Sequence, residues 1–96
     1  MRIIAESRLK RMAQEHGDCL DQVTAWVQEI RTAQWHNLME VRRTYRHADA
    51  VDDLTVFNIK GNDYRLVVGI DYQWGCIYIK HLLTHAEYDK GDWKRQ

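Results

Sequence analysis

The sequence predicts an α+β fold: a short N-terminal strand and two helices, then a three-strand antiparallel β-meander and a short C-terminal helical turn. Two observations carry this prediction. Apolar residues recur at helical spacing in the first third of the chain, whereas β-branched and aromatic runs separated by glycine-containing turns follow from Leu54 onward. The 96 residues include no proline and five glycines, so no linker divides the chain, and we expect one domain over residues 1–96.

The first elements are a strand and two helices. A short strand is predicted over residues 2–5, and Ser7 is expected to cap a helix that ends at Gly17. Asp18 is expected to cap the next helix. That helix carries one apolar stripe at helical period, made of Leu20, Val23, Trp26, Val27 and Ile30.

The middle of the chain is harder to assign. Leu38, Met39 and Val41 support a short helix before the chain becomes extended. Trp26 and Trp35 are interpreted as core residues. Cys19 and Cys76 have no metal-binding spacing, and we expect both to be reduced and buried.

The meander has a predictable register. Gly61-Asn62 suits a two-residue hairpin loop, which places Lys60 opposite Asp63 and Asn58 opposite Arg65. One face is then apolar and consists of Phe57, Ile59, Tyr64, Leu66, Val68 and Ile70. An even-length loop around residues 73–75 brings Ile77 and Ile79 to the same face.

The opposite face of the meander is predicted to be polar. It would carry Asn58, Lys60, Arg65, Tyr78 and Lys80. Three cations on one face of a small sheet predict a local anion site in a chain whose net charge is zero.

The segment after the meander has the spacing of a capped helical turn. Thr84 and Glu87 form a capping-box pattern. Within the turn, His85, Tyr88 and Asp89 stand at i, i+3 and i+4 and share one face. Such a face could bind a phosphate and move a proton, although turns of this composition are also common structural endings.

Other features give weaker indications. The densest basic run contains Arg42, Arg43 and Arg46, and such a run is either a solvated helix face or a nucleic-acid contact. His81 and His85 are four residues apart without a third ligand at sensible spacing, so no metal site is expected.

Composition excludes several classes of function. Fourteen basic and fourteen acidic residues cancel, which gives no overall argument for nucleic-acid binding. No export signal and no long apolar segment occurs, so we expect a cytoplasmic protein without a membrane partner.

Three segments carry a family resemblance. Val56–Val68, followed by Ile77–Ile79 and Thr84–Lys90, closely resembles the HigB toxins of type II toxin–antitoxin systems, a branch of the RelE-like superfamily. The resemblance implies a RelE-like fold and a ribosome-dependent mRNA endoribonuclease without metal or cofactor, in which the RNA's own 2′-hydroxyl attacks the adjacent phosphate. It also implies a HigA-type helix-turn-helix antitoxin, and an indirect contact with operator DNA through the antitoxin complex.

The resemblance further implies a set of site residues. Arg65, His85 and Tyr88 would be catalytic. RNA would be bound by Asn58, Lys60 and Lys80. The basic run adds three further candidates for RNA binding from its charge, Arg42, Arg43 and Arg46. The chain departs from its relatives in its neutral composition and in Lys80, where some of them have arginine.

Two other functions remain open. A toxin of the same fold could act by protein contact, as gyrase-directed relatives do. This hypothesis is motivated by the zero net charge and by a C-terminal Trp93 that is expected to be exposed. A non-catalytic descendant could serve only as an antitoxin-binding co-repressor.

Overall fold

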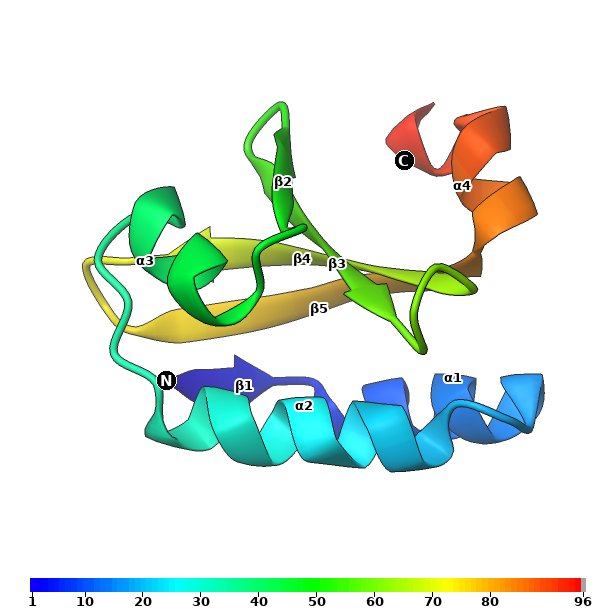
Figure 1. The fold of residues 1–96 in the computed structure, drawn as a ribbon, viewed down its shortest axis with the longest axis horizontal. Coiled ribbons are helices and arrows are strands. Elements are labelled where there is room, and N and C mark those ends of the chain that lie inside the picture. Colours follow the sequence, from blue (N-terminus) through cyan, green and yellow to red (C-terminus); the bar gives the residue numbers. More distant parts are fainter. Residues whose placement is uncertain (96) are drawn as a thin grey trace.

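The computed structural model describes residues 1–95 and has a five-stranded sheet with two helices against one face (Figure 1). The elements follow in the order β1 (Arg2–Ile4), α1 (Glu6–His16), α2 (Leu20–Thr32), α3 (Leu38–Thr44), β2 (Asp49–Val51), β3 (Leu54–Ile59), β4 (Tyr64–Asp71), β5 (Cys76–Thr84), α4 (His85–Lys90) and η1 (Asp92–Arg95). The strand order in the sheet is β1-β5-β4-β3-β2. This architecture confirms the predicted α+β class.

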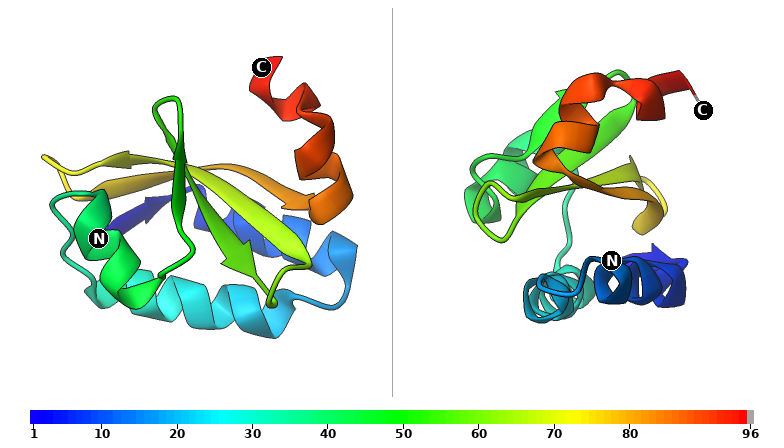
Figure 2. Two further views of the ribbon diagram at one scale, coloured as in Figure 1. Left: turned by 45° about the horizontal axis from the view of Figure 1, so that its top comes forward. Right: turned by 90° about the vertical axis from the view of Figure 1, so that its right-hand side faces the viewer.

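The main core lies between the sheet and the α1–α2 pair, which run side by side (Figure 2). Its fully buried members include Leu9, Val23, Trp26, Ile30, Phe57, Leu66, Val68 and Ile77. The predicted stripe of α2 is therefore confirmed, except that Leu20 at the start of the helix is 36% exposed. Trp35 is also buried, as expected.

Both predicted helix caps are wrong. Strand β1 turns directly into α1 at Ala5, which has a φ of 71°, so Ser7 already lies inside the helix. Helix α2 is preceded by Cys19 and has no side-chain cap. Asp18 instead accepts hydrogen bonds from Tyr64 and from Lys60, which join the α1–α2 connection to the β3–β4 hairpin.

The hairpin register is confirmed, but its turn differs from the prediction. Asn58 pairs with Arg65 and Ile59 with Tyr64. The left-handed residues are Lys60 (φ 54°) and Gly61 (φ 64°), whereas Gly61 and Asn62 were expected. Lys60 lies just beyond the end of β3, and its Nζ is 2.9 Å from the Asp18 carboxylate.

Strands β4 and β5 pair as predicted across a four-residue loop, Tyr72–Gly75. Ile77 lies opposite Ile70, and Ile79 opposite Val68. A bulge between Val67 and Val68 shifts the pairing, so that His81 faces Val67 and Lys80 is left over. The even loop length thus places the isoleucines on the core face.

Two strands extend the predicted meander at its edges. β2 pairs antiparallel with β3, and β1 pairs parallel with β5. Between them in the sequence, α3 is capped by Asn37, whose side chain accepts a hydrogen bond from the Glu40 N–H. This confirms the short helix over the Leu38 region.

The sheet face opposite α1 and α2 was predicted to be polar, but part of it is apolar. Val56 and Val67 pair across β3 and β4 and form a second small core with Trp93. Trp93 is 5% exposed, so the expected exposed tryptophan is wrong. It is buried because α4 and η1 fold back over this face (Figures 1 and 2).

Two smaller expectations concern cysteines and membranes. Cys19 is fully buried, and burial raises the pKa of its thiol, whereas Cys76 is only half-buried. Among residues 1–95, none of the helices combines the length and the apolar composition that crossing a membrane requires.

Candidate functional site

The hairpin turn and the start of α4 are joined by a backbone hydrogen bond. The His85 N–H donates to the Asp63 carbonyl at 3.0 Å. The predicted capping box is confirmed: the Thr84 hydroxyl accepts from the Glu87 N–H at 3.1 Å, and the Glu87 carboxylate accepts from the Thr84 N–H at 2.8 Å. These contacts fix where α4 begins and how it projects its side chains.

Arg65 is held beside the turn by neutral acceptors. Its Nη1 donates to the carbonyls of Asn62 (3.1 Å) and Tyr64 (3.3 Å), and its Nη2 donates to the Asn62 Oδ1 at 2.6 Å. Three of five N–H donors are thereby used, which leaves one on Nε and one on Nη2. Within residues 1–95 no carboxylate lies at ion-pair distance from Arg65. The guanidinium is thus positioned, charged and free to bind an anion.

Tyr88 lies between Arg65 and Trp93. The Arg65 Cζ is 5.7 Å from the centroid of the Tyr88 ring, a cation–π distance. The Trp93 ring stacks on the Tyr88 ring, with centroids 5.2 Å apart and an interplanar angle of 18°. The Trp93 Nε1 donates to the Tyr88 carbonyl at 3.0 Å.

The environment of Tyr88 favours the protonated form of its phenol. Burial raises its pKa, and the nearby Asp49 carboxylate raises it further, while Arg65 acts in the opposite direction. At neutral pH Tyr88 is therefore a hydrogen-bond donor.

His85 is oriented by a carboxylate on its own helix, as its spacing predicted. Its Nδ1 lies 2.9 Å from the Asp89 Oδ2, and its side chain is 45% exposed. When the proton of a neutral imidazole is on Nδ1, the atom nearest Asp89, the lone pair of the ring is on Nε2. This arrangement suits an acceptor of protons.

These contacts bring five side chains to one end of the hairpin. We call the set the hairpin–α4 site; it consists of Asn58, Asn62, Arg65, His85 and Tyr88. Asn58 belongs to it because it lies directly opposite Arg65 in the register. Asn62 was not predicted from the sequence, since its role depends on an arginine three residues later folding back onto the turn.

Lys60 does not belong to this group, contrary to the prediction of a shared cationic face. Its Nζ is paired with Asp18 on the side of α1 and α2. The hydrogen bond from Tyr64, followed by that from Lys60, lowers the pKa of Asp18. The same contacts raise the pKa of Lys60 and raise that of Tyr64 to about 12.

Lys80 lies on the same face as Arg65 but not beside it. Its side chain passes over Gly69, two steps of alternation along β4 from Arg65 and thus roughly 13 Å away. The small core under Trp93 lies between them. Lys80 instead lines a hollow with Asp52, Asp53, His81, Trp93 and Lys94.

All three arginines of the basic run are exposed, and Arg42 is the one whose side chain forms hydrogen bonds within residues 1–95. The Arg42 side chain donates to the Ala48 carbonyl at 2.8 Å and to the Asp49 carboxylate at 3.3 Å. Arg43 and Arg46 are exposed. Arg46 also lines a hollow that contains Asn58, which brings part of the run next to the hairpin–α4 site.

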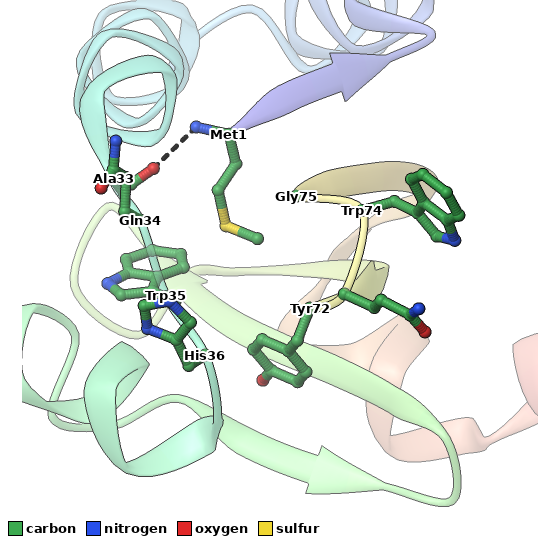
Figure 3. Close-up of a pocket in the computed structure, with 9 residues that line it drawn as sticks. Met1, Ala33, Gln34, Trp35, His36, Tyr72, Trp74 and Gly75 are labelled. Atoms are coloured by element: carbon green, nitrogen blue, oxygen red, sulfur yellow. Dashed lines mark hydrogen bonds between the residues drawn. The ribbon is translucent and has the colours of Figure 1, made fainter.

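A further cavity lies near the other end of β4. Met1, Ala33, Gln34, Trp35, His36, Tyr72, Gln73, Trp74 and Gly75 line its volume of about 350 Å³ (Figure 3). Trp74 stands at its rim and is 75% exposed. Arg65, His85 and Tyr88 do not line this cavity.

Metal chemistry has no evident ligand set in the described part of the chain. Across residues 1–95, no three His, Cys, Asp or Glu side chains are grouped to hold a metal ion. His81 packs near the Trp93 ring, and burial lowers its pKa, with Arg8 and Lys80 adding to the effect.

Comparison with known proteins adds one finding. The sequence model of a protein family, HigB_toxin, described as the RelE-like toxic component of a toxin–antitoxin system, matches residues 19–91. A search of curated proteins found no match. The matched span includes every member of the hairpin–α4 site.

Proposed function

Because this chain belongs to the HigB toxin family of RelE-like toxic components, we propose that it arrests growth as a ribosome-dependent mRNA endoribonuclease. The observation that carries the proposal is that three groups lie at one end of the hairpin: Arg65, Tyr88 and the His85–Asp89 pair. An anion-binding group, a proton donor and a proton acceptor are what cleavage by the RNA's own 2′-hydroxyl requires.

In the proposed reaction, the 2′-hydroxyl loses its proton to the Nε2 of His85. Its oxygen attacks the adjacent phosphorus, and the bond from phosphorus to the 5′-oxygen of the next nucleotide breaks. The products are a 2′,3′-cyclic phosphate and a 5′-hydroxyl, whose proton comes from Tyr88 or from solvent. Asp89 stabilises the imidazolium that forms, as the 2.9 Å contact with Nδ1 allows.

Arg65 would stabilise the charge that develops on the phosphate. Its free Nε–H and Nη2–H lie on one edge of the guanidinium, and this edge matches two phosphate oxygens. The bonds to Asn62 and Tyr64 hold the fork in place before RNA binds, so little reorganisation is needed in the transition state.

As a member of a toxin–antitoxin family, the chain has an antitoxin as its partner. We propose that the antitoxin is of the HigA type, with a helix-turn-helix domain through which the complex contacts operator DNA. We also propose that the ribosome presents the mRNA, because zero net charge gives the chain little attraction of its own for RNA.

Induction of the chain in cells, with sequencing of mRNA ends, tests the proposal. Wild-type protein should arrest growth and cut mRNA at codon-linked positions, and Arg65→Ala and His85→Ala should abolish both effects. His36→Ala is the matched control for the histidine, since His36 also pairs with a carboxylate four residues on, Glu40, at 3.0 Å. Arg11→Ala on α1 is the control for the arginine.

The same experiment separates the other two functions. Full toxicity of folded Arg65→Ala and His85→Ala with intact mRNA would favour action by protein contact. Of the two features that motivate that alternative, the exposed Trp93 is removed, because Trp93 is buried, and the zero net charge stays. Wild-type protein that binds antitoxin tightly without arresting growth would favour the non-catalytic co-repressor.

A further inference from the structure

A groove adjoins the hairpin–α4 site on the side of the α3–β2 connection. It consists of two adjoining hollows of about 240 Å³ and about 430 Å³, which share His47, Asn58 and Gly61. We call it the hairpin groove. Asn62 lines it and also accepts from the Arg65 guanidinium, while Asn58 lies opposite Arg65. The groove therefore opens beside the charge proposed to bind the phosphate.

The walls of the groove offer unused hydrogen-bonding groups. His47 is exposed and Asn58 is half-buried, and neither side chain is engaged in a hydrogen bond within residues 1–95. A carboxamide presents a donor and an acceptor together, and a neutral imidazole presents one of each. At Gly61 the space is open, because an added Cβ would meet no atom within 4 Å.

We propose that the hairpin groove binds one nucleobase, that of a nucleotide flanking the scissile phosphate, and that His47 and Asn58 bind its edge. The proposal rests on the proposed function. A base and its phosphate belong to one nucleotide, so a base site must adjoin the phosphate site, as the groove does. Proteins read single-stranded RNA through unstacked bases that are hydrogen-bonded at their edges.

The chemistry of the groove favours a base over a bare anion. Among the described residues that line it, the one permanently charged side chain is that of Arg46, which is exposed. The paired donors and acceptors of Asn58 and His47 match those of a base edge, whereas a phosphate only accepts hydrogen bonds. Arg46 is placed to neutralise a flanking phosphate.

The test uses the full chain with programmed ribosomes and a pool of mRNAs with randomised codons, and sequences the new ends. Wild-type protein should prefer certain bases at one position next to the cut. In His47→Ala and Asn58→Ala this preference should weaken by about fivefold or more, the discrimination expected of a bidentate contact. In both variants, the rate of cutting at disfavoured sites should fall less than it falls in Arg65→Ala. His36→Ala should keep the wild-type preference.

The outcomes distinguish the two proposals. Wild-type protein that leaves mRNA intact would overturn the proposed function and the base site with it. Cutting whose base preference survives in both variants would overturn the base site alone, and so would an equal loss of cutting at every sequence. His47→Gln retains hydrogen-bonding groups, so it should restore part of the preference if His47→Ala folds poorly by circular dichroism.

Discussion

The burial of Trp93 predicts a large effect of the substitution Trp93→Ala. The indole is 5% exposed, packs against Val56 and Val67, and donates a hydrogen bond to the Tyr88 carbonyl. Truncation of a buried aromatic residue to alanine costs about 3–5 kcal/mol in the free energy of unfolding. Of this, the hydrogen bond accounts for about 1 kcal/mol. Since domains are stable by about 5–15 kcal/mol, the variant should fold with a much lower urea midpoint.

Urea denaturation followed by far-ultraviolet circular dichroism measures this effect. Trp74→Ala is the matched control: Trp74 is 75% exposed, and its truncation should change the free energy of unfolding by about 0.5 kcal/mol or less. Trp93→Phe keeps a ring to stack on Tyr88 but loses the Nε1–H donor, so its loss should lie between those of the two alanine variants. Equal losses for Trp93→Ala and Trp74→Ala would refute the buried position of Trp93.

Three further predictions concern pH, capping and the arginine fork. Because the pKa of Asp18 is lowered in the folded state, its contribution to stability is present above the unfolded pKa and is lost as pH falls through the folded pKa. Asp18→Asn should therefore flatten the acid limb of the urea midpoint plotted against pH, and an unchanged limb would contradict the contacts of Asp18. Thr84→Ala removes the acceptor of the α4 capping box and should cost about 1 kcal/mol in urea denaturation; no loss would mean that α4 does not depend on its cap. Arg65→Lys keeps the charge but not the fork that binds Asn62 and phosphate, so mRNA cleavage should fall at least about 100-fold, and wild-type cleavage by this variant would exclude a bidentate role.

The strand pattern predicted most of the sheet because alternation and turn length are local properties. Asn58 faces Arg65 once the turn between them has two residues at its tip. Similarly, the capping box depends on residues three apart, and it predicted both the start of α4 and the shared face of His85 and Asp89.

The remaining parts of the site depend on contacts between distant segments. The position of Lys60 is set by Asp18, 42 residues earlier in the chain, and this contact removes it from the expected cationic face. Trp93 is buried because the chain folds back after α4 onto Val56 and Val67. Neither contact has a signature in the local sequence, so the side chains could be assigned to a strand end or a helix end but not to their partners.

The parallel pairing of β1 with β5 has a consequence for synthesis of the protein. Arg2 lies opposite Cys76, so β1 cannot pair in the sheet until β5 has been made. Strand pairs whose members are this far apart in the sequence form late in folding, because the chain loses entropy on loop closure before any contact between the strands stabilises it. Helices α1 and α2, which are made before the meander, acquire their apolar partner only when the meander is complete. A nascent chain that stops short of β5 therefore lacks both its closing strand and α4, and the hairpin–α4 site cannot form until both elements have been made.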